Sequence, residues 1–113
     1  MATGKYNMIC PQVATFSKRL TWTIDDVPVD LSSYTGKMQA RDKHGGSCLV
    51  VDITTENGGI SLDNEGNIDL LIDSEDTELI IAKQYVYDLE LDSGSEVYRI
   101  IEGKFIVTPE VSI

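Results

Sequence analysis

The alternation of apolar and polar side chains between residues 84 and 92 constrains the fold of this chain more than any other feature. The residues on one side of the alternation are Tyr85, Tyr87, Leu89 and Leu91. A period of two is typical of a β-strand that buries one face. A short polar link follows, Ser93-Gly94-Ser95, whose glycine accepts the positive φ of a hairpin turn. The sequence therefore predicts a β-hairpin with its inner face in a hydrophobic core.

The second arm of this hairpin runs toward the C-terminus. We expect a return strand over residues 96–102, a bulge or bend at Gly103, and further extended structure over residues 104–108. Pro109 has no amide donor, so strand pairing should end there.

Another alternating segment lies earlier in the chain. Leu20, Trp22 and Ile24 are separated by Thr21 and Thr23, so the three apolar side chains are predicted to face the core. A tryptophan that fills the core predicts a loss of about 3–5 kcal/mol of stability for Trp22→Ala.

Further short apolar segments complete an all-β pattern. They cover residues 6–10, 27–31, 37–42, 48–53, 60–62 and 67–72, with turns rich in Gly, Asn, Asp and Pro between them. The only helical candidate is the segment 73–81, with Ser74 as its N-cap, whereas a parallel sheet needs a helix after nearly every strand. We therefore predict an all-β fold, an antiparallel β-sandwich of about seven to eight strands with one short helical connection, favoured over a barrel.

Length and charge limit the class of protein. The 113 residues predict a single domain, 1–113, in which residues 1–10 form a terminal arm or an edge strand. The 19 acidic and 9 basic side chains leave a net charge of −10, which argues against a nucleic-acid partner. No stretch approaches the roughly 20 apolar residues of a membrane helix. Residues 1–10 also lack the apolar core of a signal peptide, so we expect no membrane partner and synthesis in the cytoplasm.

The residue types that most often carry chemistry are few and scattered. Cys10 and Cys48 match no metal or redox spacing, and in a reducing cytoplasm they are expected as free, buried thiols. His44 is the only histidine and lies in a glycine-containing turn. Residues 63–69 carry oxygen ligands at alternate positions, but a glycine at the fourth position favours a β-turn over a calcium loop. We predict no catalytic residue, no cofactor and no bound metal.

Two passages resemble structural proteins of tailed bacteriophages. The motifs LTWTI at residues 20–24, VPVDL at 27–31 and YTG at 34–36 are similar to the opening of the N-terminal domain of the baseplate upper protein family. The motifs YVYDLEL at residues 85–91, IEG at 101–103 and TPEV at 108–111 resemble the ending of small phage virion proteins. The long fibre-like extension of a baseplate protein does not accompany these motifs here.

This resemblance implies an immunoglobulin-like sandwich and a non-enzymatic virion structural protein. The protein would be a capsid decoration module or a tail, neck or baseplate adaptor, made in the bacterial host cytoplasm. It would enter the virion as a homo-oligomer or in symmetric copies, in contact with other phage virion proteins. The alternative is a host-glycan-binding β-sandwich module, in which an exposed tyrosine contacts the saccharide.

Apolar side chains near both termini are candidate assembly edges. Met8 and Ile9 lie in the first apolar segment, and Val111 and Ile113 follow Pro109. An open strand edge can accept a strand from a partner protein. The alternative is that these residues form ordinary edge strands of the domain's own sheet.

Overall fold

The computed structural model describes residues 4–43 and 49–109 and shows an all-β protein. Its strands, in chain order, are β1 (Gly4–Lys5), β2 (Met8–Pro11), β3 (Phe16–Thr21), β4 (Thr23–Ile24), β5 (Val27–Pro28), β6 (Thr35–Arg41), β7 (Leu49–Thr54), β8 (Ile60–Leu62), β9 (Asn67–Ile72), β10 (Gln84–Asp92) and β11 (Val97–Thr108). One helix, α1 (Ser74–Thr77), connects β9 to β10 within the described residues.

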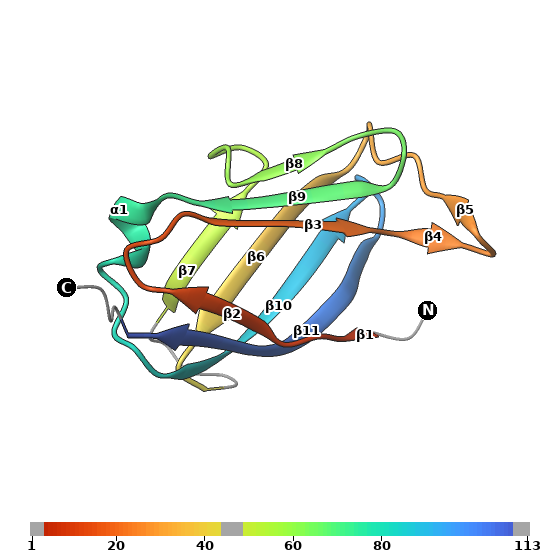
Figure 1. The fold of residues 1–113 in the computed structure, drawn as a ribbon. Coiled ribbons are helices and arrows are strands. Elements are labelled where there is room, and N and C mark those ends of the chain that lie inside the picture. The colour runs from red at the N-terminus through yellow and green to blue at the C-terminus, as the bar shows by residue number, and fades with distance from the viewer. Residues whose placement is uncertain (1–3, 44–48, 110–113) are drawn as a thin grey trace.

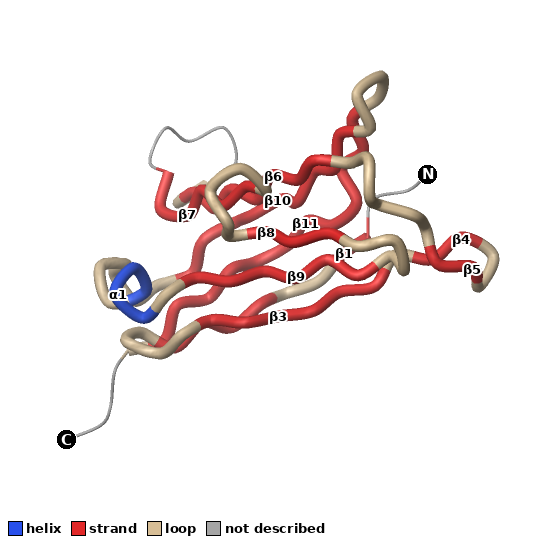
Figure 2. The backbone as a smooth tube through the Cα atoms, turned by 90° about the horizontal axis from the view of Figure 1, so that it is seen from above, coloured by secondary structure: helices blue, strands red, loops and turns tan. Residues whose placement is uncertain are grey.

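Nine of the eleven described strands form two sheets that face each other across the core, and β4 and β5 pair only with each other. The large sheet has the order β1-β11-β10-β6-β7, and β2 also pairs with β11. The small sheet has the order β3-β9-β8 and lies across the large one (Figure 1). Viewed from above, its three strands run side by side over the larger layer (Figure 2). The short hairpin β4–β5 projects from one end of the molecule, and α1 lies at the other (Figure 1).

Strand β10 is central to the large sheet, because it pairs with β11 on one side and with β6 on the other. Its four inward side chains are all buried, which confirms the alternation that the sequence predicts; they are Tyr85, Tyr87, Leu89 and Leu91. Full burial of a large apolar side chain contributes about 1.5–3 kcal/mol. The inner face of β10 is therefore a main source of stability.

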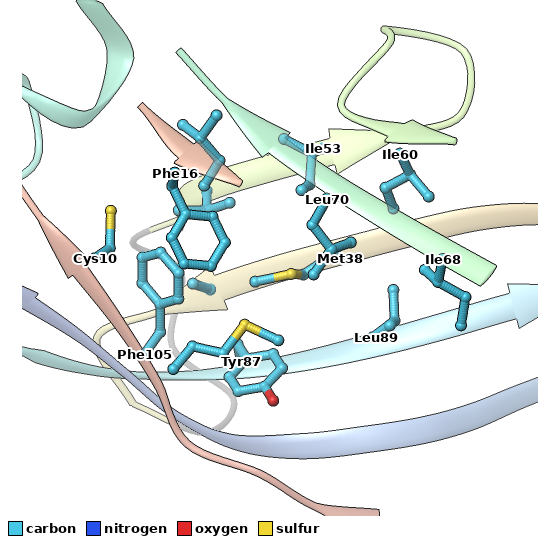
Figure 3. Packing of buried hydrophobic residues seen from close by; sticks show 14 of the residues in the cluster. Cys10, Phe16, Met38, Ile53, Ile60, Ile68, Leu70, Tyr87, Leu89 and Phe105 are labelled. Carbon is cyan, nitrogen blue, oxygen red and sulfur yellow. The ribbon is translucent and has the colours of Figure 1, made fainter. Parts of the chain in front are cut away.

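The small sheet supplies the other half of the core. Phe16 of β3 and Leu70 of β9 point toward Met38 and Phe105 of the large sheet (Figure 3). The rings of Phe16 and Phe105 meet edge to face with centroids 5.6 Å apart, and Phe105 meets Tyr87 at 6.5 Å. Edge-to-face pairs add about 0.5–1.5 kcal/mol to the burial of their area.

The N-terminal segment lies along β11 and makes the large sheet a mixed one. Both β1 and β2 pair with β11 in the parallel direction, so the prediction of a purely antiparallel sandwich is wrong at this edge. Between β1 and β2 the chain approaches Gly103 so closely that a Cβ atom there would overlap the carbonyl oxygen of Tyr6. The same oxygen accepts a hydrogen bond of 2.5 Å from the Tyr87 hydroxyl.

The predicted bulge or bend at Gly103 is absent, and β11 runs unbroken from Val97 to Thr108. The irregularity in the hairpin lies instead opposite Leu89 and Glu90. Glycine is required at position 103 because the backbone of Tyr6 packs against it. This contact joins residues that are far apart in sequence, so the residue pattern of the strand does not predict it.

The number of strands and the helix cap also differ from the predictions. The described residues contain eleven strands where about seven to eight were predicted, because three strands of two residues each, β1, β4 and β5, add to the count. The one short helical connection is present. Ser74 is not its cap, because Asp73 occupies the N-cap position and makes no side-chain cap bond. Thr77 instead anchors the helix by donating a hydrogen bond of 2.9 Å to the carbonyl of Ala14.

The alternating segment that begins at Leu20 is only partly buried. Leu20 and Trp22 are half-buried, and Ile24 is 51% exposed, so its predicted core position is wrong. The physical reason is that β3 ends at Thr21 and the chain then leaves the body as the β4–β5 hairpin. Trp22 packs at the base of this hairpin, with its ring 6.2 Å from that of Tyr34 and 5.9 Å from that of Tyr98.

Trp22→Ala is therefore expected to lower the free energy of unfolding by about 1–3 kcal/mol, less than loss of a fully buried aromatic side chain. Urea unfolding followed by circular dichroism measures this change. Phe105→Ala is the matched control, because Phe105 is fully buried. Equal losses for the two variants would contradict the half-buried position of Trp22.

Tyr87→Phe should destabilise the protein by about 1 kcal/mol, because the Tyr6 carbonyl loses its donor. Tyr98→Phe is the matched control, since its hydroxyl donates to the carboxylate of Glu96 at the exposed surface. That change should stay below about 0.5 kcal/mol. The prediction fails if both variants shift the urea midpoint equally.

Candidate assembly surfaces

The β4–β5 hairpin carries exposed apolar side chains away from the body of the protein (Figure 1). Its turn residues Asp25 and Asp26 both have positive φ, 52° and 65°, as a two-residue type I′ turn requires. Ile24 and Val27 face each other across the turn and are 51% and 62% exposed. The tip therefore presents an apolar pair beside two carboxylates.

The base of the hairpin is fixed to the small sheet by the loop that precedes β9. The amide of Trp22 donates to the carbonyl of Gly66 at 2.8 Å, and the amide of Val29 donates to the carbonyl of Trp22 at 3.1 Å. Gly66 has a φ of +78°, and a Cβ atom there would lie 2.5 Å from the Trp22 oxygen. The hairpin is thus held in a defined direction.

An apolar groove continues this surface toward the body. It has a volume of about 570 Å³ and lies between the end of β3 and the β1–β11 edge. Leu20, Trp22 and Ile101 contribute to its walls. We refer to this groove together with Ile24 and Val27 as the hairpin surface.

The loop that resembles a calcium site is a β-turn held by its own carboxylate. Asp63 accepts hydrogen bonds from the amides of Glu65 and Asn67, at 2.8 and 3.0 Å, and from the side-chain amide of Asn67 at 2.9 Å. These bonds, those from Asn67 first, lower the pKa of Asp63. Within residues 4–43 and 49–109, no group of three or more His, Cys, Asp or Glu side chains is placed to hold a metal ion.

The predicted assembly edges are only partly within the described residues. Strand β2 lies at the edge of the large sheet, as the sequence suggested. Ile9 is 62% exposed, but Met8 is buried in the core and is not available to a partner. Val111 and Ile113 lie outside the described residues. Addition of a partner strand at this edge stays a prediction.

The remaining candidate chemistry is sparse. Cys10 is a free, buried thiol whose pKa is raised to about 11 by burial, so it stays protonated at neutral pH. Cys48 and His44 lie outside the described residues. On the outer face of β10, Asp88 and Glu90 lie 3.6 and 3.8 Å from Arg99 and Lys37 in partly exposed ion pairs. Pairs of this kind contribute about 0–1 kcal/mol.

Comparisons with known proteins give no relative: no protein-family model matches the chain, and no curated protein matches it. In the part of the chain that the structure describes, no helix is long and apolar enough to cross a membrane.

The exposed position of the hairpin surface was not predicted, although the sequence carries a signal for the hairpin. Asp25-Asp26 between two β-branched apolar residues is a pattern for a two-residue hairpin. The same apolar residues also fit the period of a buried strand, so the pattern alone does not show that this segment leaves the core.

The pKa of Asp63 is lowered in the folded state, which predicts a pH-dependent contribution to stability. A lowered pKa stabilises the fold above the unfolded value of about 3.9, and this contribution is lost as the pH falls through the folded pKa. The stability advantage of the wild type over Asp63→Asn should therefore be present at neutral pH and shrink below about pH 4.

Urea unfolding between neutral and strongly acidic pH measures this advantage. Glu78→Gln, at an exposed carboxylate, is the control for general effects of charge. A difference between wild type and Asp63→Asn that does not change with pH would contradict the role of the Asp63 carboxylate.

Proposed function

We propose that this chain is a non-enzymatic structural protein of a tailed-bacteriophage virion that acts by protein–protein assembly. In this role it is a capsid decoration module or a tail, neck or baseplate adaptor. The observation that carries the proposal is the hairpin surface, an apolar tip held rigidly outside the body. Contiguous exposed apolar surface on a soluble domain is typical of a protein contact.

The resemblance to phage proteins supplies the biological setting. The motifs at residues 20–24 and 27–31, which resemble the baseplate upper protein family, form the end of β3 and the β4–β5 hairpin. The passage that carries the resemblance is thus the same passage that carries the exposed apolar tip.

The immunoglobulin-like form of the sandwich is part of the proposal, and the strand order supports it. In this reading β3, β9 and β8 take the places of strands B, E and D, and β11, β10, β6 and β7 take those of G, F, C and C′. A tyrosine near the start of strand F commonly bonds back to the backbone a few residues upstream. Tyr85 does this, because its hydroxyl donates to the carbonyl of Ile81 at 2.6 Å.

Assembly in many copies also suits the charge of the chain. A net charge of −10 keeps free copies soluble and discourages non-specific association before assembly. The glycan-binding alternative has less support, because Trp22 and Tyr34 meet edge to face and brace the hairpin base.

Labelling of purified phage particles with an antibody against this chain tests the proposed function. Label spread over heads supports a decoration module, and label at one vertex or on the tail supports an adaptor. The chain should also be present in denatured particles. Its absence from both intact and denatured particles would overturn the virion proposal.

The double variant Ile24→Ser/Val27→Ser should reduce the number of copies per particle by about tenfold, because a central apolar pair of a contact is worth about 1.4 kcal/mol or more. Quantitative immunoblotting of particles measures the copies, and urea unfolding checks that the variant folds. Leu71→Ser, at an exposed apolar position of β9, is the matched control. Equal incorporation of both variants would exclude the hairpin as the contact.

A further inference from the structure

A second groove lies at the α1 end of the molecule, opposite to the hairpin (Figure 1). It opens between the edge strand β7 and the segment from α1 to the start of β10, with a volume of about 570 Å³. Its walls include Leu49 and Val51 from β7 and Leu79 and Ile81 from the other side. The hairpin surface does not include this groove, and of the motifs that resemble phage proteins only Tyr85 borders it.

The two most exposed large apolar side chains of the described residues border this groove. Leu79 is 78% exposed and Ile81 is 74% exposed, and between them Ile80 is buried in the core. This segment is the turn that follows α1, in which the amides of Leu79 and Ile80 donate to the carbonyls of Asp76 and Thr77 at 3.1 and 3.2 Å. Leu79 and Ile81 therefore leave an apolar surface uncovered.

This exposed segment is held in place by hydrogen bonds to its backbone carbonyls. The side-chain amide of Gln12 donates to Ile80 at 2.7 Å, and the Tyr85 hydroxyl donates to Ile81 at 2.6 Å. The amide of Val107 donates to Lys83 at 2.9 Å. Because the segment is already ordered, a partner that binds it loses little binding free energy to ordering.

The rim of the groove is acidic. Asp42, Asp52 and Asp76 border it, against the single cation of Lys83, whose ammonium lies 5.4 Å from the centre of the Tyr85 ring. The Oδ1 atom of Asp42 is buried and has no hydrogen-bond partner among residues 4–43 and 49–109. Asp42 as a whole is half-buried, so its carboxylate remains partly accessible to a guanidinium or ammonium from a partner.

The edge of β7 limits how a partner can bind. The side chain of Asn57 accepts from the amide of Thr54 at 2.9 Å and donates to the carbonyl of Asp52 at 3.1 Å. These bonds occupy one outward amide and one outward carbonyl in the second half of β7. A full partner strand therefore cannot pair along β7, whereas a side-chain anchor can enter the groove beside its first half.

We propose that this groove binds a segment of another protein that presents a large apolar side chain next to an arginine or lysine. The apolar side chain packs against Leu79 and Ile81, and the cation pairs with Asp42 and the acidic rim. A second copy of this chain is disfavoured as the occupant, because its net charge is −10. The inference rests on the proposed assembly function and adds a second contact with a defined partner chemistry.

The full chain, labelled with ¹⁵N, is titrated with the synthetic peptide acetyl-Ser-Arg-Leu-Arg-Ser-amide and followed by NMR. The expected result is amide shifts confined to residues 42, 49–53 and 76–85, which border the groove. The peptides with Arg-Ser-Arg and Asp-Leu-Asp centres should bind at least about tenfold more weakly, because each lacks one half of the recognition. Equal binding of the Arg-Ser-Arg peptide would overturn the proposal, since the interaction would then reflect charge alone.

Variants then locate the site. Leu79→Ser/Ile81→Ser and Asp42→Asn should each weaken binding of the Arg-Leu-Arg peptide by about tenfold. Leu71→Ser, at an exposed position of β9, should leave it unchanged. Unchanged binding by either groove variant would overturn the proposal. So would sedimentation of the free chain as a dimer that Leu79→Ser/Ile81→Ser dissociates, because the occupant would then be a second copy.

The result for this groove can be distinguished from the result for the proposed virion function. If the chain is found in particles but the peptide does not bind, this inference falls and the virion proposal stands. If the peptide binds at the groove but particles lack the chain, the virion proposal falls and the groove remains a binding site for a basic, apolar segment.

Discussion

Burial of the inner face of β10 is the constraint on which the rest of the structure depends. Both edges of β10 are paired, and its inward side chains lie at the centre of the core. The small sheet can cover this face only where it supplies matching apolar side chains, as Phe16 and Leu70 do (Figure 3). The order of the other strands follows from this central position, because each extends the sheet outward from β10.

The N-terminal segment is joined to this centre by its pairing with β11 and by a side-chain contact from β10. The Tyr87 hydroxyl reaches the Tyr6 carbonyl, and the absence of a side chain at Gly103 lets the N-terminal segment approach β11. Burial raises the pKa of Tyr87, so its hydroxyl remains a donor at neutral pH. Tyr87 thus contributes, with the buried side chains of Met8 and Cys10, to joining the parallel edge of the large sheet to the hydrophobic core.

The surfaces proposed for assembly are the apolar residues that this core leaves out. One set lies on the β4–β5 hairpin and the other beside α1, at opposite ends of the molecule (Figure 1). Both are held by backbone hydrogen bonds and both have carboxylates nearby. Together, the two proposals describe a small acidic protein that contacts a different neighbour at each end.

The local residue pattern was enough to predict the strands that have one apolar and one polar face. The all-β class, the inner face of β10, and strands β6 to β9 follow from residue alternation and turn residues, because period-two burial is a local property. The short helical connection follows in the same way, although its cap does not. These elements carry most of the core.

Only the tertiary structure decided which apolar segments reach that core. Ile24 and Met8 both lie in short apolar segments, yet Ile24 is exposed on the hairpin and Met8 is buried in the core beside β11. The parallel edge, the reason for Gly103 and the half-buried position of Trp22 depend on residues far apart in sequence. The exposure of the Leu79 and Ile81 side chains is likewise determined by the tertiary structure. The residue pattern predicts which apolar side chains share one face of a strand. Tertiary packing determines whether another segment of the chain covers that face.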